Sequence, residues 1–227
     1  MTQLLAVAAL GFFLGMRHAT DPDHVVAVTT IVARQRSIRA AALTGAVWAL
    51  GHTLTIMMVG GGIILFGWVI PPRVGLSMEF SVGVMLILLG VMNLWSARQA
   101  IHDQVAPART SRADEALGRS SLTRSLVVGL IHGLAGSAAV ALLVLAVIGK
   151  STWSLLYLLI FGLGTVVGMV LVTAAIGVPF AARGSRFGRL NRALRMAAGG
   201  VSVALGLFIA YKIGIVEGLL SGHAPSR

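Results

Sequence analysis

The sequence predicts an all-α integral membrane protein with six transmembrane helices, which form two inverted three-helix repeats with the first helix broken at Asp21-Pro22. Three observations support this fold class. Of the 227 residues, 57% are apolar and only 11% are charged, a composition that soluble domains rarely have. The apolar residues form six long segments, and the second half of the chain resembles the first half.

Each of the six segments is apolar over the ~20 residues that a helix needs to cross a bilayer. They lie at residues 3–33, 40–68, 76–97, 125–148, 153–180 and 196–216. The first, third and fifth loops carry thirteen lysines and arginines, whereas the second and fourth carry only Arg73 and Lys150. Because positively charged loops stay in the cytoplasm, we expect a multi-pass protein of the cytoplasmic (inner) membrane with both termini on the outer side. The first segment then crosses the bilayer once.

The net charge of +11 would suit nucleic-acid binding if the arginines covered a soluble surface. They are instead confined to short stretches between apolar segments, so the expected partner is the lipid bilayer and not a nucleic acid. The chain has no cysteine, which excludes disulfides, thiolate metal sites and iron–sulfur clusters. Any metal chemistry must therefore use histidine, carboxylate, methionine or backbone ligands.

A shift of about 114 residues aligns the two halves of the chain. Gly15-Met16-Arg17-His18 aligns with Gly129-Leu130-Ile131-His132, Leu50-Gly51 with Leu163-Gly164, and Gly83, Gly90 and Trp95 with Gly199, Gly206 and Tyr211. Each half has an odd number of spans, so the halves must be inverted relative to each other. Inverted repeats with a broken helix are a recurring transporter plan, and the site lies near midplane at the repeat interface. Chance similarity between glycine-rich apolar helices is the alternative.

The repeat divides the chain into three parts. Residues 1–97 are the first three-helix repeat with the metal motif, residues 98–124 are a flexible cytoplasmic linker, and residues 125–227 are the second, inverted repeat. The fifth loop has an arginine at every third residue from Arg183 to Arg195. A plain cytoplasmic loop explains this pattern, and a short amphipathic helix on anionic lipid is the alternative.

The first span contains a cluster of ionisable residues within seven positions: His18, Asp21, Asp23 and His24. Such groups are costly inside a membrane and are functional candidates by default. On an unbroken helix the two histidines and Asp23 would point in three directions. Pro22 disfavours helical geometry at Asp21 and suits the start of a new helix, so we predict a break near residues 19–21 that brings these side chains together. Asp21 suits capping of the second half-helix as well as it suits metal binding.

Two further histidines join the candidate metal ligands. His52 lies midway along the second span beside Gly51, and His132 is the repeat counterpart of His18. A helix-breaking structural role is the alternative for His132, whose half lacks the two carboxylates. The predicted metal-site residues are His18, Asp21, Asp23, His24, His52 and His132. Imidazole with one or two carboxylates favours late first-row divalent ions over Mg²⁺ and Ca²⁺, which prefer oxygen ligands alone.

Arg17 flanks the cluster, and we expect it to pair with Asp21 or another carboxylate. The tryptophans are expected to lie mostly near span ends as interfacial anchors; they are Trp48, Trp68, Trp95 and Trp153.

The segment from Arg17 to His24 contains His18, four residues, then Asp23 and His24, and it resembles the signature of the nickel/cobalt transporter family. Leu50-Gly51-His52-Thr53 resembles that family's second, histidine-containing segment, and His132-Gly133-Leu134-Ala135-Gly136-Ser137 resembles the urease-associated permease branch. The chain has six predicted spans where the best-known members have eight, and it lacks their later Asp-Thr-Ala-Thr-Glu type segment. The resemblance implies metal recognition by His18, Asp23, His24 and His52, and a urease or hydrogenase maturation system downstream.

We therefore expect a secondary transporter that takes up Ni²⁺ or Co²⁺ as its substrate, without a cofactor and without enzymatic activity. No P-loop pattern is present, and an inside-negative potential can drive a divalent cation inward without ATP. One alternative is an exporter of the same fold, although no histidine-rich cytoplasmic tract is visible. The other is an intramembrane zinc-dependent hydrolase, in which Asp21 would serve as a base.

Overall fold

The structure is a computed structural model that describes residues 2–33, 35, 37–102, 122–135, 151–181 and 185–220. All regular elements in these ranges are helices. They are α1 (Thr2–His18), α2 (Pro22–Val32), α3 (Ile38–Phe66), α4 (Pro72–His102), a helix at Leu122–Ala135, α6 (Ser151–Ala181), α7 (Ser185–Tyr211) and the π-helix η2 (Lys212–Val216). The all-helical prediction is confirmed.

The first span is broken where the sequence predicts. The helix α1 ends at His18, and α2 begins at Pro22, whose fixed backbone suits the first helical position. Between them the chain turns tightly, because the backbone N–H groups of Thr20 and Asp21 donate to the carbonyls of Arg17 and His18 at 2.9 and 3.1 Å. The ordinary helical bonds are replaced by short turn bonds, so the chain changes direction at the depth where the ionisable residues lie.

The long helices begin and end at residues that suit those positions. Ser37 caps the start of α3, and its side chain accepts a hydrogen bond from the N–H of Ala40 at 3.2 Å. Gly67 ends α3 in the left-handed conformation, with φ of 65°, which glycine adopts without a steric penalty. The two prolines at 71–72 then start α4.

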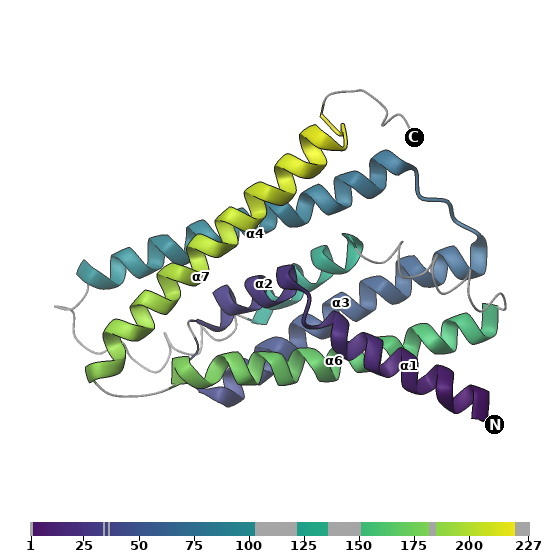
Figure 1. Cartoon of the computed structure of the whole chain (residues 1–227), viewed down its shortest axis with the longest axis horizontal. Helices are drawn as coiled ribbons and strands as arrows, with labels where there is room; N and C mark the ends of the chain where they lie inside the picture. Colours follow the sequence, from purple (N-terminus) through teal and green to yellow (C-terminus); the bar gives the residue numbers. More distant parts are fainter. Residues whose placement is uncertain are drawn as a thin grey trace.

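The helices form two outer layers around α2 (Figure 1). One layer is the pair α4 and α7, and the other contains α1, α3 and α6. The short helix α2 contacts α3, α4, α6 and α7, so it joins the two layers. Its buried residues Ala27, Val28, Ile31 and Val32 belong to the main apolar cluster together with residues of both layers. The half-helix that follows the break is therefore the centre of the core.

Glycines let the helices approach at backbone distance. A methyl group on Gly15 would collide with the carbonyl oxygen of Phe161 in α6, and one on Gly164 would collide with that of Phe12 in α1. Helix α3 and the helix Leu122–Ala135 approach each other in the same way. A methyl group on Gly129 would collide with the carbonyl oxygen of Trp48, and one on Gly51 would collide with that of Leu126. These contacts fix how the helices are positioned along each other, and therefore where the neighbouring side chains lie, because small residues allow helices to pack closely in a membrane.

Two of the three pairs of corresponding helices in the predicted repeats, α4 with α7 and α3 with α6, lie side by side and run antiparallel. In one pair, Gly83 of α4 faces Gly206 of α7, and Gly90 faces Gly199. In the other, Gly45 of α3 meets Thr173 of α6, and Gly162 meets Thr53.

The outer surface of the helices is apolar. Exposed large hydrophobic residues follow one face of α6 at helical spacing: Leu156, Leu159, Leu163, Val167, Leu171 and Val178. Among the described residues four helices are long and apolar enough to cross a membrane, namely those at 38–66, 72–98, 152–181 and 190–216. A soluble monomer rarely exposes so large an apolar surface, so the chain is a multi-pass membrane protein.

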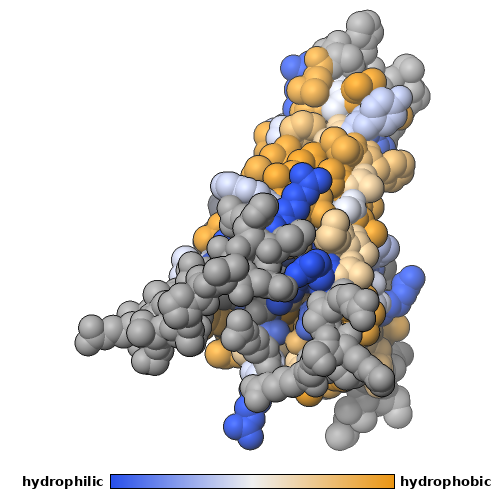
Figure 2. Space-filling model, turned by 90° about the vertical axis from the view of Figure 1, so that its left-hand side faces the viewer, coloured by the Kyte–Doolittle hydropathy of each residue, from blue (hydrophilic) through white to orange (hydrophobic). Residues whose placement is uncertain are grey.

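The start of α3, the ends of α4 and α6 and the start of α7 gather at one end of the bundle, at the left in Figure 1. Figure 2 looks onto this end, where blue, hydrophilic side chains lie between grey atoms and orange, hydrophobic surface, and the upper part of the view is mostly orange. These are the ends that border the arginine-rich first, third and fifth loops. The start of α1 and the end of α7 lie toward the opposite end.

Some predicted boundaries change. The helix α4 continues to His102, five residues beyond the predicted end at 97, and α7 begins at Ser185 rather than at 196. Residues 185–195 are thus the first turns of a long helix, and are neither a loop nor a separate amphipathic helix. Residues 103–121 of the predicted linker and the second half of the fourth predicted span lie outside the described residues.

Candidate metal site

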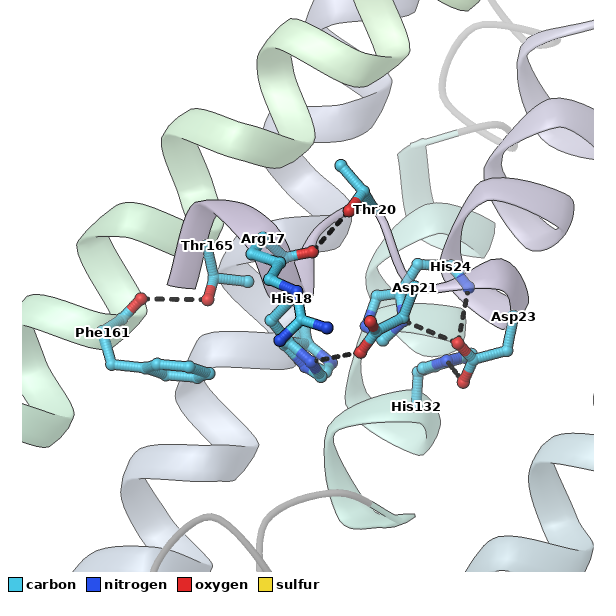
Figure 3. Close-up of polar contacts among 10 residues, drawn as sticks. Arg17, His18, Thr20, Asp21, Asp23, His24, His132, Phe161 and Thr165 are labelled. Carbon is cyan, nitrogen blue, oxygen red and sulfur yellow. Dashed lines mark hydrogen bonds and ion pairs between the residues drawn. The ribbon is translucent and has the colours of Figure 1, made fainter. Parts of the chain in front are cut away.

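The break between α1 and α2 brings all six predicted site residues into one polar cluster. Figure 3 labels His18, Asp21, Asp23, His24 and His132 in this cluster. His18 comes from the end of α1, Asp21 from the break, Asp23 and His24 from the start of α2, His52 from the middle of α3 and His132 from the helix Leu122–Ala135. The side chains of His24, His52 and His132 are almost completely buried, with exposures of 2%, 0% and 2%. Polar side chains at this depth are expensive unless they are paired or bind a ligand.

His18 is held between a carboxylate and another imidazole. Its Nδ1 lies 2.7 Å from Asp21 Oδ2, and its Nε2 lies 3.1 Å from His52 Nε2. An ionised carboxylate only accepts hydrogen bonds, so Nδ1 of His18 carries the proton and Nε2 keeps its lone pair. Asp21 thus fixes the tautomer that can bind a metal through Nε2, which is the common arrangement around metal-binding histidines.

Asp23 joins α2 to the helix Leu122–Ala135. Its Oδ2 accepts a hydrogen bond from His132 Nε2 at 2.8 Å, and its Oδ1 accepts from His24 Nδ1 at 3.1 Å and from the backbone N–H of His24 at 3.0 Å. These bonds place the protons on the nitrogens that face Asp23. The opposite nitrogens, His24 Nε2 and His132 Nδ1, are buried and have no partner within the described part of the chain.

Two aromatic side chains pack against the imidazoles. The ring of Trp48 lies 5.4 Å from that of His24 and 5.6 Å from that of His132, and the ring of Phe161 lies 5.5 Å from that of His18. Trp48 is fully buried and is not an interfacial anchor, so the expectation for this tryptophan is wrong. The signal for its role was its spacing, because Trp48 precedes His52 by four residues and lies on the same face of α3. Phe161 gave no comparable signal in the sequence.

Two other expectations for this region change. Asp21 occupies the position before α2, but its side chain makes no capping hydrogen bond and contacts His18 instead. Within the described residues, Asp21 pairs with His18, and Arg17 forms no ion pair. The stronger local partner for Asp21 is the imidazole three residues before it, because the turn at residues 19–21 folds the two side chains together.

The cluster offers two groups of metal ligands. His18, His24 and His52 form one, and Asp23, His24 and His132 form the other; in each, one ligand atom per residue lies within 4.8 Å of the others. Two nitrogens that bind one ion at about 2.1 Å and lie 3.1 Å apart, as in His18 and His52, subtend about 95° at the ion. That angle suits a late first-row divalent ion bound by imidazole.

Comparisons with known proteins cover almost the whole chain. A family model described as the transmembrane region of cytochrome c biogenesis proteins matches residues 24–208. The urease accessory protein UreH of Bacillus sp. (strain TB-90) is 37% identical over 219 residues, which are 95% of both chains. Two Arabidopsis thaliana proteins, Chloroplast protein FOR GROWTH AND FERTILITY 2 and 1, are 26% and 24% identical over 92% and 90% of this chain, which spans 57% and 59% of their lengths. No solved structure matches the chain.

Proposed function

We propose that this chain takes up Ni²⁺ or Co²⁺ across the cytoplasmic membrane. It belongs to the transmembrane family of the cytochrome c biogenesis proteins and to the family of the urease accessory protein UreH. The chain is a membrane protein and not an enzyme. The observation that carries the proposal is the cluster of four imidazoles and two carboxylates at the broken first span.

The ligand chemistry supports a late first-row divalent ion as the substrate. Four imidazoles with two carboxylates suit nickel and cobalt, whereas Mg²⁺ and Ca²⁺ are bound by sets of oxygen ligands. Because the chain has no cysteine, thiolate capture of softer ions plays no part. The ion loses its water shell as it reaches the buried imidazoles, which hold lone pairs toward it at His18 and His24.

Repeated contacts in the two halves support an inverted duplication in which six spans are divided into repeats at 1–97 and 125–227, joined by the linker 98–124. The contact of Gly15 with Phe161 and the contact of Gly129 with Trp48 are related by the same shift that aligns the sequences. The ring contacts His18–Phe161 and His132–Trp48 are related in the same way, at 5.5 and 5.6 Å. The antiparallel pairing of α3 with α6 and of α4 with α7 is the arrangement that inverted repeats produce.

The site then lies where α1 and α2 of the first repeat and the helix Leu122–Ala135 of the second repeat come together, near the middle of the membrane. Rocking of the repeats about it would expose the ion to each side in turn. With the arginine-rich loops in the cytoplasm and both termini outside, an inside-negative potential of ~100 mV favours inward movement of a divalent ion by ~4.6 kcal/mol, twice the value for one charge. This is more than three powers of ten in accumulation, so ATP is not needed.

The name of the Bacillus relative ties that protein to urease. We infer that the imported metal serves a nickel enzyme such as urease or hydrogenase during its maturation. The lipid bilayer and the metal ion are the partners that this function requires.

Radiotracer nickel uptake in cells tests the function. His18→Ala and His52→Ala should each lower uptake at least tenfold, because each removes one of two nitrogens that face each other at 3.1 Å. The matched control is His102→Ala, which changes a histidine at the last residue of α4 that belongs to neither group of ligands found in the described part of the chain. Normal nickel uptake by both site variants would reject the proposal, and competition by cobalt and zinc would rank the substrates.

A further inference from the structure

We infer that the cluster contains two adjacent ion positions that share His24, and that a single ion passes from one to the other during transport. The first position is formed by His18, His24 and His52, and the second by Asp23, His24 and His132. This inference rests on the proposed function, and it adds a second site and an internal step to it.

His24 lies at the centre of the cluster. Its ring centroid is 4.6 Å from that of His18, 4.9 Å from that of His52 and 4.3 Å from that of His132. Its two nitrogens serve different surroundings, because Nδ1 lies 3.1 Å from Asp23 Oδ1, whereas Nε2 is buried without a partner in the described part of the chain. The nitrogens of an imidazole point away from each other, so one ring can serve two positions in turn.

The two positions differ in charge and in the helices that build them. The first offers three neutral imidazoles from α1, α2 and α3, and the second offers two imidazoles and the carboxylate of Asp23 from α2 and the helix Leu122–Ala135. A carboxylate attracts a dication more strongly than a neutral ring does, and it compensates the loss of one imidazole. The ion therefore finds ligands of comparable affinity on both sides of His24. Similar affinities allow it to move between the positions, because neither position binds it too tightly to release it.

Simultaneous occupation of both positions is unfavourable. Two divalent ions separated by a single imidazole repel each other strongly in a buried site, because the low dielectric of the interior screens them poorly. An ion at the second position must also replace the hydrogen bonds that Asp23 now accepts from His132 and His24. Exchange between positions therefore requires one ion and small side-chain movements, and the ion leaves one nitrogen of His24 as the ligands of the other position bind it.

Titration of the purified protein in detergent with Co²⁺ tests the two positions. Calorimetry gives the stoichiometry and affinity, and nickel uptake in cells gives transport for the same variants. The informative variants are His52→Ala, which removes a ligand of the first position only, His132→Ala, which removes one of the second only, and His24→Gln, which removes the shared ligand. The double variant His52→Ala/His132→Ala damages both positions and leaves His24 in place.

Wild-type protein should bind one Co²⁺ per chain. If the two positions are similarly populated, loss of either one leaves the other intact, so each single variant should weaken binding only about twofold and by less than tenfold. His24→Gln and the double variant should each weaken it at least a hundredfold. Uptake should fall at least tenfold in all four variants, because each interrupts passage between the positions.

Several results would overturn the inference. Equal losses of affinity in His52→Ala, His132→Ala and His24→Gln would indicate one common site, and two ions bound per wild-type chain would contradict alternate occupation. Size-exclusion chromatography checks that each variant is folded, and the double variant replaces His24→Gln in the comparison if that protein aggregates. Failure of the proposed function itself looks different, since wild-type protein would then neither bind nor take up the metal.

Discussion

Replacing Asp21 by asparagine should weaken nickel binding at the first ion position about tenfold, although the residue lies outside both groups of ligands. Asp21 Oδ2 is 2.7 Å from His18 Nδ1 and holds the proton there, which leaves the lone pair on Nε2 toward His52. Asparagine can present its NH₂ group instead of its oxygen, and it then favours the opposite tautomer with a proton on Nε2. That tautomer cannot bind a metal through Nε2.

The size of the effect follows from the exposure of the pair. A hydrogen bond to a charged group contributes ~1.5–3 kcal/mol, and loss of such a supporting partner typically lowers metal affinity by about 10- to 100-fold. The side chain of Asp21 is 46% exposed, so water screens its charge and the lower end of the range applies. Tenfold corresponds to ~1.4 kcal/mol.

Initial rates of nickel uptake against concentration measure this effect as a rise in the half-saturation concentration. The control is Glu217→Gln, which also removes one negative charge but at the Lys212–Glu217 pair beyond α7, with a separation of 3.4 Å. An unchanged half-saturation concentration in Asp21→Asn, with the control also unchanged, would refute the assignment of Asp21 as the residue that orients His18.

Two further predictions concern packing and spectroscopy. Gly164→Ala should destabilise the protein by ~1–3 kcal/mol through overpacking against α1, and a thermal melt in detergent should show a drop of about 2–4 °C per kcal/mol. Gly200→Ala is the control, since no described atom beyond its chain neighbours and the nearby backbone of its own helix lies within 4 Å of an added methyl group there; an equal drop in both variants would contradict the close contact. Binding of Ni²⁺ should quench the fluorescence of Trp48, whose ring is 5.4 Å from that of His24, and Trp48→Phe should remove most of the quenching. Quenching that survives in Trp48→Phe would place the ion elsewhere.

The sequence was informative about this fold where a single residue constrains the backbone. Pro22 gave the break between α1 and α2 correctly, because proline can begin a helix but cannot continue the preceding one. The apolar segments located the long helices but not their ends, since α4 and α7 extend as regular helix beyond the apolar residues. Helix length in the polar regions depends on packing and on the aqueous boundary, which hydropathy does not record.

The candidate site could be predicted as a set of residues but not as an arrangement. The cost of ionisable groups in a membrane identified His18, His52 and the rest from their positions alone. The sequence could not show that Asp21 holds His18, or that Asp23 reaches His132 across 109 positions of the chain. Those contacts depend on the rotation of each helix about its axis, which the glycine contacts between helices determine and a single sequence does not reveal.

The packing of α1 and of the helix Leu122–Ala135 has a consequence for biosynthesis. The helix α1 packs against α6, and the helix Leu122–Ala135 packs against α3, so a helix from each half of the chain packs against the other half. A nascent chain that has inserted only its first three spans has already synthesised His18, His24 and His52, but α1 has no surface to dock against until α6 follows. The candidate site can therefore reach the arrangement described above only after α6 has been synthesised, late in translation.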